Sequence, residues 1–299
     1  MQYRRLGSTE INTSVIGLGT WQFGGEWGKT FTPEDVKAII MEAENQGINF
    51  IDTAECYGDH LSEKLIGEAV KDRRESWVIA TKFGHHYHAF LDRTMDFSVE
   101  GVRKQLELSL SALQTDYLDL YQFHSGTLPD YLNRRLWEML NKEKERGRIL
   151  HLGVSISNSI SPEDKIRQME MAEDFGIETV QIVYNRLQRF PERNIFPLCV
   201  KYDAGVLVRV PLASGLLSGK YQPGHRFTGE DVRASRNEED IEDDLIRVQQ
   251  IKEREIPGGT DMAAWALAWC LRQETISCVI PGCKSPEQVR ANAQAVKLL

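Results

Sequence analysis

The chain has 299 residues, of which 41% are hydrophobic and 27% charged, a composition typical of a soluble globular protein. This length permits a complete core without disulfides or metals, and it fits either one large barrel or two ordinary domains. The net charge of -8 and the pI of about 5.5 argue against nucleic acid or an anionic membrane as the main partner, while a local basic pocket for phosphates stays compatible with them.

Cysteine usage and the N-terminal segment indicate the compartment. The five cysteines include no CxxC pair and no Cys/His spacing typical of a metal site, which favours a reduced, cytoplasmic setting. The N-terminus lacks the apolar core of a signal peptide, and no segment reaches the ~20 apolar residues that span a bilayer. The residues of the run His85–His88 are adjacent and cannot all face one ion, so we interpret it as a polar loop and expect no metal.

Short apolar runs alternate with helical patterns along the chain. Because the runs are mostly continuous and rich in Val and Ile, they predict strands buried on both faces, as in a parallel sheet. They cover Val15–Leu18, Ile48–Ile51, Trp77–Ala80, Leu118–Phe123, Ile149–Val154, Thr179–Val183, Val206–Val210 and Ser277–Ile280. Eight such strands in a chain of this length predict a (β/α)8 TIM barrel, with residues 1–299 as a single domain.

Helices between the strands are marked by apolar stripes and by capping signals. Three segments place a hydroxyl, then Pro, then an acidic residue, as at a helix start: Thr32–Asp35, Ser161–Asp164 and Ser285–Gln288. The stripes are Val102, Leu106, Leu110 and Leu113; Leu132, Leu136, Met139 and Leu140; and Met262, Trp265 and Trp269. We interpret them as helix faces that pack on a barrel.

Three further segments lie outside the repeating pattern. Residues Tyr3–Ser14 contain two short runs around a Gly-Ser-Thr turn and predict a small β-hairpin outside the barrel. Residues 222–240 are polar and aperiodic and predict a long loop after strand 7. The helical pattern at Ile241–Arg254 is then an addition, since Asp261–Arg272 can serve as the barrel helix.

Three ionisable residues follow successive strands at the ends where barrel enzymes place their chemistry. Asp52, Lys82 and His124 each end a predicted strand, and Tyr57 lies in the loop five residues after Asp52. A tyrosine hydroxyl can protonate a carbonyl oxygen, but its unperturbed pKa is ~10. The ammonium of Lys82 would lower that pKa toward the working pH, Asp52 would hold Lys82 charged, and His124 could orient the carbonyl.

With these residues in place, the chain resembles the aldo-keto reductase superfamily along essentially its whole length. The matching segments are Gly17–Trp21, Phe50–Gly58, Ala80–Lys82, Tyr121–His124, Gly153–Ser155 and Ser214–Lys220. The resemblance implies a (β/α)8 barrel, a nicotinamide cofactor bound without a Rossmann fold, and a catalytic tetrad of Asp52, Tyr57, Lys82 and His124.

The glycines of the first strand–loop do not have GxGxxG spacing and no helix follows at once, so we reject a Rossmann site. By resemblance, the backbone at Gly19 and Thr20 would approach the nicotinamide, and Trp21 would wall the substrate pocket; plain packing is the alternative for Trp21. Phe83, the loop at His85–His88 and the long loop after Lys220 are the other predicted walls of the substrate pocket.

The segment Ile280–Ser285 connects the last strand to a helix whose N-terminus is a potential anion site, with Gly282 in the turn. By resemblance, Lys284, Ser285 and Gln288 would meet a 2′-phosphate and Asn292 the adenine, which favours NADPH over NADH. Ser285 could equally cap its helix, and both roles can hold together.

The resemblance assigns further cofactor contacts after strands 5, 6 and 7. These are Ser155, Asn158 and Gln181 for the carboxamide, Arg209 for stacking on the nicotinamide, and Pro211, Leu212, Ser214, Gly215, Leu216 and Lys220 for the pyrophosphate. Two positions depart from many family members. Ile156 follows Ser155 where Asn is usual, with Asn158 two residues later, and Arg209 stands where Tyr is usual.

The leading hypothesis is therefore a cytoplasmic, NADPH-dependent reductase of small aldehydes and ketones, with Tyr57 as proton donor and with neither nucleic acid nor membrane as partner. An alternative is a binding protein that senses nicotinamide redox state with slow turnover, as channel-associated relatives do. A metal-assisted hydrolase lacks a ligand set. The sequence does not specify the carbonyl substrate or the oligomeric state.

Overall fold

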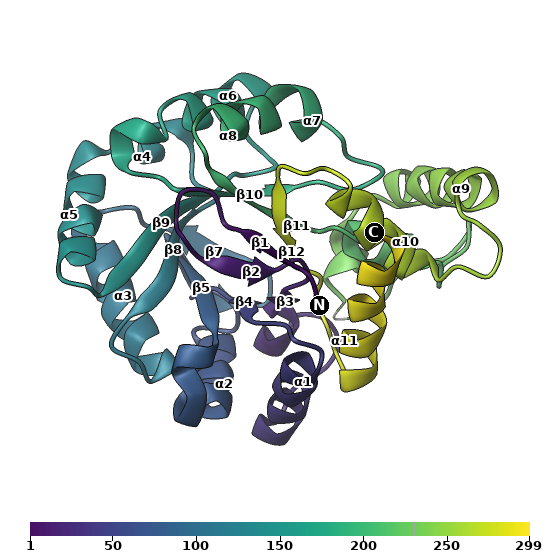
Figure 1. Cartoon of the computed structure of the whole chain (residues 1–299), viewed down its shortest axis with the longest axis horizontal. Helices are drawn as coiled ribbons and strands as arrows, with labels where there is room; N and C mark the ends of the chain where they lie inside the picture. The colour runs from purple at the N-terminus through teal and green to yellow at the C-terminus, as the bar shows by residue number, and fades with distance from the viewer. Residues whose placement is uncertain (230) are drawn as a thin grey trace.

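Eight parallel strands form one sheet in the computed structural model, which describes residues 1–229 and 231–299 (Figure 1). The strand order is β12-β11-β10-β9-β8-β5-β4-β3, so neighbours along the chain are neighbours in the sheet. The strands are β3 (Leu18–Gly19), β4 (Phe50–Asp52), β5 (Val78–Phe83), β8 (Leu118–His124), β9 (Ile149–Ser155), β10 (Thr179–Val183), β11 (Gly205–Arg209) and β12 (Ile276–Val279).

The two edges of the sheet meet beside Gly17. The Gly17 N–H donates to the Val279 carbonyl at 2.8 Å, and the Gly19 N–H donates to the Pro281 carbonyl at 3.0 Å. Isolated parallel bridges join Ile16 to Val279 and Gly19 to Gly282. The sheet is thus a closed barrel, as the sequence predicts.

Each predicted run overlaps a barrel strand, and the first strand differs most from its predicted run. It was expected to be strand over Val15–Leu18, but β3 covers only Leu18–Gly19. A Cβ added at Gly17 would lie 2.9 Å from the Cys278 sulfur and 3.0 Å from Phe50. This edge therefore closes through single bridges around a glycine, which a pattern of apolar residues does not reveal.

One barrel helix follows each strand: α1 (Pro33–Asn45), α2 (Leu61–Val70), α3 (Val99–Leu113), α5 (Arg134–Glu145), α6 (Pro162–Glu170), α8 (Phe196–Lys201), α10 (Met262–Leu271) and α11 (Pro286–Ala293). The predicted starts of α1, α6 and α11 are confirmed, because Thr32, Ser161 and Ser285 each accept a hydrogen bond from a first-turn amide. The α3 stripe is buried as predicted. Leu132 was wrongly assigned to the next stripe, since it precedes α5 and is 40% exposed.

Shorter segments complete the described chain. They are the helices α4 (Leu128–Tyr131) and α7 (Pro191–Asn194), and the 3-10 turns η1 (Trp21–Gly24), η2 (Lys71–Ser76), η3 (Glu173–Phe175) and η6 (Gln294–Leu298). No helix in residues 1–229 and 231–299 is long and apolar enough to cross a membrane.

Two antiparallel hairpins accompany the barrel. The predicted one pairs β1 (Tyr3–Arg5) with β2 (Asn12–Ser14) and crosses one end of the barrel (Figure 1). Leu6 from its turn packs with Phe50 and Leu120 inside the barrel. The second hairpin pairs β6 (His85–Ala89) with β7 (Asp92–Met95), so the predicted polar loop at His85–His88 is wrong. Backbone pairing with β7 stabilises this strand, and that pairing requires no apolar alternation.

The connection from β11 to α10 carries the added helix α9 (Glu238–Glu255). Before it lie the 3-10 turns η4 (Ala213–Ser218) and η5 (Val232–Ser235). The long loop predicted over residues 222–240 is therefore present in the described residues 222–229 and 231–237, residue 230 lies outside the described residues, and residues 238–240 belong to α9. Asn237 caps that helix by accepting from the amides of Glu239 and Asp240. Its apolar face packs on η4 and α10 through Ile241, Leu245 and Val248.

Candidate active site

The four predicted tetrad residues meet at the carboxyl ends of the barrel strands. Asp52 ends β4, Lys82 lies on β5, His124 ends β8, and Tyr57 lies in the turn before α2. The Lys82 ammonium donates to Asp52 Oδ1 at 2.7 Å, to the Thr53 carbonyl at 2.7 Å and to the Tyr57 hydroxyl at 3.2 Å. The ring centroids of Tyr57 and His124 lie 6.3 Å apart, edge to face.

Burial and charge oppose each other in this group. Burial alone lowers the pKa of Lys82, but the charge of Asp52 and its hydrogen bond outweigh burial and raise that pKa above its ordinary value, so Lys82 stays charged. Burial raises the pKa of Tyr57 to about 12, and the positive charge of Lys82 offsets only part of this. Lys82 acts in the predicted direction, but the prediction that it brings this pKa toward working pH is wrong because burial outweighs it. Tyr57 holds its proton, as a proton donor must.

His124 is held as a neutral ring. Burial and the positive charges of Lys82, Arg209 and Arg93 lower the pKa of His124 well below its ordinary value. Its Nδ1 lies 3.8 Å from the Cys56 sulfur and 3.7 Å from Glu55 Oε1. A neutral imidazole beside Tyr57 can orient a carbonyl by hydrogen bonding without adding charge.

Asp52 is the centre of a wider polar network. Its Oδ2 accepts from the Gln181 amide at 2.6 Å and from the Gln122 amide at 3.2 Å, while Oδ1 accepts from Lys82. The Asp52 backbone carbonyl accepts from the Thr20 hydroxyl at 2.9 Å. The carboxylate is 3% exposed and its two oxygens accept three donors, so its position is strongly fixed.

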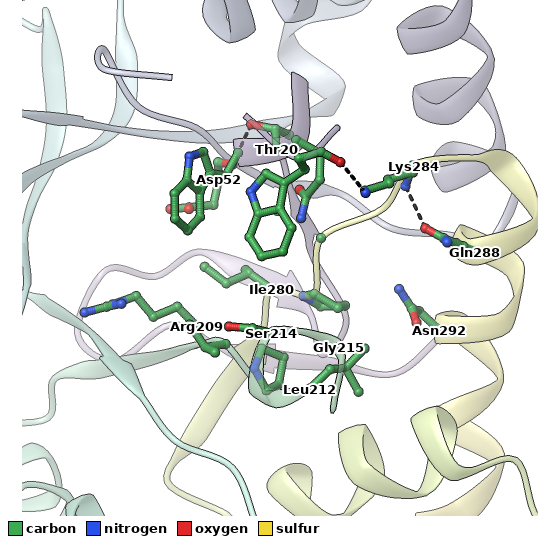
Figure 2. Close-up of a pocket in the computed structure, with 18 of the residues that line it drawn as sticks. Thr20, Asp52, Arg209, Leu212, Ser214, Gly215, Ile280, Lys284, Gln288 and Asn292 are labelled. Carbon is green, nitrogen blue, oxygen red and sulfur yellow. Dashed lines mark hydrogen bonds between the residues drawn. The ribbon is translucent and has the colours of Figure 1, made fainter. Parts of the chain in front are cut away.

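A cavity of about 710 Å³ extends from the tetrad to the N-terminus of α11. In Figure 2, Arg209 and the segment Leu212–Gly215 lie on one side of it, and Lys284, Gln288 and Asn292 lie at one end. The predicted cofactor residues that line it are Gly19, Thr20, Trp21, Gln181, Arg209, Pro211, Leu212, Ser214, Gly215, Lys220, Gly282, Lys284, Gln288 and Asn292. A volume of this size suits an elongated organic cofactor with a small substrate.

The α11 end of the cavity is cationic. Burial and the charges of Arg233, Lys220 and Lys29 lower the pKa of Lys284, while Asp231 opposes them, so four positive groups lie close together. The Lys284 N–H donates to Gln288 Oε1 at 2.7 Å, and the Lys284 ammonium donates to the Trp27 carbonyl at 2.6 Å. These positive groups repel one another and lie beside a helix N-terminus, so they would be stabilised by an anionic group such as phosphate.

The segment after β11 has a strained backbone. Val210, Ala213 and Ser214 have φ values of 56°, 48° and 56°, and Gly215 has a φ of 91°. Arg233, from the long connection before α9, donates to the Ser214 carbonyl at 3.1 Å and so holds this turn. Left-handed backbone is costly for residues other than glycine and gathers at functional sites. The turn is shaped to present backbone groups to a ligand.

Arg209 is enclosed where the sequence places a ring of the cofactor. Its guanidinium donates to the Ile156 carbonyl at 3.0 Å, and its Nε is buried without a hydrogen-bond partner among the described residues. Burial lowers the pKa of Arg209, while Tyr57, in its ionised form, and Asp52 oppose this. A planar cation with an unsatisfied N–H, facing the cavity, fits a flat heteroaromatic ring. The residues of this cavity therefore fit a nicotinamide dinucleotide.

Lys82 lies behind Tyr57 and does not line the cavity, and neither do five of the single residues predicted to contact the cofactor or the substrate. Phe83 is wrong as a substrate wall: Lys82 points into the barrel, so its neighbour points outward, and Phe83 packs against Tyr121. Asn158 is exposed and does not line the cavity, so its position gives no support to the predicted contact with the carboxamide.

The other three lie behind the cavity lining. Ser155 is buried and donates to Gln181 at 3.4 Å, so it can act only through that amide. Leu216 is buried against α9 and α10. Ser285 caps α11 by accepting from the Gln288 amide at 3.4 Å. These positions support the lining instead of forming it.

The cavity also includes residues that sequence reasoning missed. Trp27 forms an isolated antiparallel bridge with Asp231, which brings the long connection after β11 over the cavity beside Arg233. Cys56 and Arg93 were also missed and line the cavity around His124, whereas His85, which lines it too, belongs to the predicted wall at His85–His88. Cys56 lies inside the Asp52–Gly58 segment that carries the family resemblance, but the approach of β6 and β7 had no signal in the sequence.

The chain forms a closed barrel, and its strand ends bring Asp, Tyr, Lys and His together beside a cavity of dinucleotide size. This combination is typical of an oxidoreductase of carbonyl compounds. The sequence profile of the family described as "Aldo/keto reductase family" matches residues 15–299, and the chain belongs to that family. It is an NAD(P)H-dependent aldo-keto reductase.

Two relatives illustrate the range of the family around this chain. The NADH-specific methylglyoxal reductase of Escherichia coli is 32% identical over 98% of this chain and 93% of its own length. The holo form of an aldo-keto reductase from Bacillus halodurans has a TM-score of 0.83 at 30% identity, over 99% of this chain and 91% of that chain.

A further solved structure, the glycerol dehydrogenase of Gluconobacter oxydans, has a TM-score of 0.81 at 28% identity, over 98% of this chain and 89% of that chain. The names of these relatives refer to different substrates, so membership of the family does not determine the substrate of this chain.

Proposed function

We propose that the protein reduces small aldehydes and ketones to alcohols with NADPH, and that Tyr57 delivers the proton to the carbonyl oxygen. The observation that supports this most strongly is the chain of contacts from Asp52 through Lys82 to the Tyr57 hydroxyl, at 2.7 and 3.2 Å, at the edge of a large cavity.

The chain's own residues have separate tasks in this reaction. The bound nicotinamide supplies the hydride. Tyr57 keeps its proton until a developing alkoxide accepts it, and the Lys82 ammonium stabilises the phenolate that remains. Asp52 holds Lys82 in place, and His124 orients the carbonyl as a neutral donor. Trp21, stacked on Tyr57 at 6.0 Å between ring centroids, forms the wall against which a small carbonyl compound would lie.

The preference for NADPH over NADH is supported by the cationic end of the cavity. Lys284 is joined there by Lys29, Lys220 and Arg233, more positive charge than a diphosphate alone requires. Since a relative with 32% identity is named as NADH-specific, the two cofactors must be compared directly. We further propose that residues 1–299 act as one catalytic domain in the cytoplasm.

The test is a panel of aldehydes and ketones assayed with NADPH and NADH side by side. Tyr57→Phe should lower the turnover of any accepted carbonyl by roughly 10²–10⁴-fold while NADPH binding, followed by fluorescence, persists. Tyr202→Phe, at the end of α8 and far from the cavity, is the matched control and should turn over normally.

Near-normal turnover in Tyr57→Phe would overturn the proton-donor role. The redox-sensing alternative makes a different prediction: in single-turnover experiments, bound NADPH would stay unoxidised with every carbonyl of the panel, in the unmodified chain as well as in Tyr57→Phe.

A further inference from the structure

Three potential metal ligands from separate segments converge beside the tetrad. Cys56 lies in the turn after β4, His85 begins β6, and His124 ends β8. One ligand atom from each lies within 4.8 Å of the other two. The imidazole centroids of His85 and His124 are 4.5 Å apart, and all three residues line the cavity. Because the three residues are 29 and 39 positions apart along the chain, the sequence has no motif that displays them together.

The hydrogen bonds of His85 leave one of its nitrogens free to bind an ion. Its Nε2 lies 2.7 Å from the His124 carbonyl oxygen, which can only accept a hydrogen bond. Nε2 therefore carries the proton of the neutral ring, and the lone pair is on Nδ1. This arrangement also matches a common feature of metal sites, where the second nitrogen of a ligating histidine donates to a carbonyl.

A buried carboxylate that pairs with no Lys or Arg among the described residues lies next to this cluster. Glu55 is 2% exposed, accepts from the His85 backbone N–H at 2.8 Å and lies 3.7 Å from His124 Nδ1. Its Oε2 is buried with no hydrogen-bond partner among the residues described. Within that part of the chain no Lys or Arg pairs with it, whereas Lys82 is paired with Asp52 and Arg93 with Glu26. An unpaired buried anion is costly, and a cation in the cluster would balance it.

We propose that Cys56, His85 and His124 form a binding site for one borderline-soft divalent cation such as Zn²⁺, and that this cation inhibits the reductase. One thiolate and two imidazoles suit Zn²⁺, whereas Mg²⁺ and Ca²⁺ prefer oxygen ligands. On binding, the Cys56 thiol releases its proton to solvent and the sulfur–zinc bond replaces the S–H bond.

The movement needed to form the site is small. Zinc bonds of ~2.0–2.3 Å to nitrogen and sulfur place the ligands of a tetrahedral site roughly 3.3–3.8 Å apart. The sulfur of Cys56 and Nδ1 of His124 are already 3.8 Å apart. The remaining ligand pairs, all within 4.8 Å, need to close by at most about 1–1.5 Å. The expectation of no metal from the adjacent run His85–His88 concerned a different set of residues, of which only His85 takes part here.

Inhibition rests on the proposed function, because His124 is the ring expected to orient the carbonyl. A cation bound to this ring and to its neighbours would occupy the place where the carbonyl oxygen lies, so Zn²⁺ should compete with the carbonyl substrate. Binding of NADPH should persist, since the groups proposed for its phosphates, around Lys284, lie at the opposite end of the cavity.

The first experiment measures metal binding without turnover on the full chain. Titration calorimetry with Zn²⁺ should give one ion per chain, and Co²⁺ should give the intense visible bands of a tetrahedral site with a sulfur-to-cobalt charge-transfer band. Cys56→Ser should abolish that charge-transfer band, and His85→Gln should weaken Zn²⁺ binding by at least about tenfold. His88→Gln, on the exposed part of the same strand, and Cys199→Ser, on the buried face of α8, are the matched controls and should bind as the unmodified chain does.

The second experiment measures Zn²⁺ inhibition of whichever carbonyl reduction the panel identifies. Competition with the carbonyl, lost in Cys56→Ser and retained in Cys199→Ser, is the expected result. No zinc binding to the unmodified chain, or equal binding in Cys56→Ser and His85→Gln, would overturn the site. A chain that binds zinc through these residues but reduces no carbonyl would instead refute the proposed function and leave the metal site standing.

Discussion

Replacing Lys82 by Met tests how far the ion pair behind Tyr57 supports the fold as well as the chemistry. The Lys82 ammonium is fully buried and all its hydrogen bonds go to Asp52, Thr53 and Tyr57. Met fills a similar volume but leaves the Asp52 carboxylate buried without its counter-ion. Removing one partner of such a pair costs about 3–5 kcal/mol. The amides of Gln181 and Gln122 still donate to Asp52, so we expect a loss near ~3 kcal/mol.

The assay is urea unfolding followed by circular dichroism and tryptophan fluorescence, with coincident transitions required before a free energy of unfolding is assigned. Adding Asp52→Asn to Lys82→Met removes the unpaired charge, so the double variant should recover at least about 1 kcal/mol of the loss. Lys142→Met, on the exposed face of α5, is the matched control and should change stability by less than ~0.5 kcal/mol. A cost below ~1 kcal/mol for Lys82→Met, or no recovery in the double variant, would refute this reasoning.

Three further predictions follow from the same structure. Lys284→Ala should raise the KM for NADPH by roughly tenfold or more and the KM for NADH far less, and equal effects on both would remove the phosphate role. Gly7→Ala should lower the free energy of unfolding by more than ~2 kcal/mol in urea unfolding, since the added Cβ would lie 2.1 Å from the Gly205 amide nitrogen. The control Gly147→Ala adds a Cβ with no atom within 4 Å, so it should cost only about 1–2 kcal/mol of backbone strain. Burial and the neighbouring His124 lower the pKa of His85 from 6.5 to about 4. Below pH 6.5 the unfolded chain therefore binds more protons than the folded chain, so the free energy of unfolding should fall by about 2 kcal/mol as the pH falls from 7 to 5. His85→Gln should reduce this loss, and an unchanged pH profile of stability would contradict the prediction.

The barrel and the tetrad were predictable because both follow from repeating geometry. Strand positions could be read from continuous apolar runs, and residues at the carboxyl ends of parallel strands must meet at one rim. That is why Asp52, Lys82 and His124 were identified together although 72 positions separate Asp52 from His124 in the chain. Phe83 shows the same rule applied incompletely: the alternation that turns Lys82 inward also turns Phe83 outward, so its assignment to the pocket was avoidable.

Other features depend on contacts that a sequence pattern does not contain. The pairing of β6 with β7 is made by backbone groups, so the position of His85 beside His124 had no side-chain signal. The pKa of Tyr57 is set by a balance in which burial exceeds the effect of Lys82, and that balance requires the packed structure. Likewise, Arg233 reaches the Ser214 turn only because the connection after β11 folds back over the cavity.

The interior of the barrel explains why the ion pair tested with Lys82→Met is tolerated in a buried place. One layer of inward side chains is apolar: Phe50, Ala80, Leu120, Leu207 and Cys278 pack together over Leu6 from the hairpin. Two residues further along four of these strands, alternation again points side chains inward, and these are polar: Asp52, Lys82, Gln122 and Arg209. The apolar layer excludes water from below, which strengthens each charge interaction in the polar layer and makes each missing partner costly. Lys82 and Asp52 are therefore stabilising only as a pair, and the same enclosure that makes the pair necessary for folding keeps the Tyr57 proton available for the carbonyl.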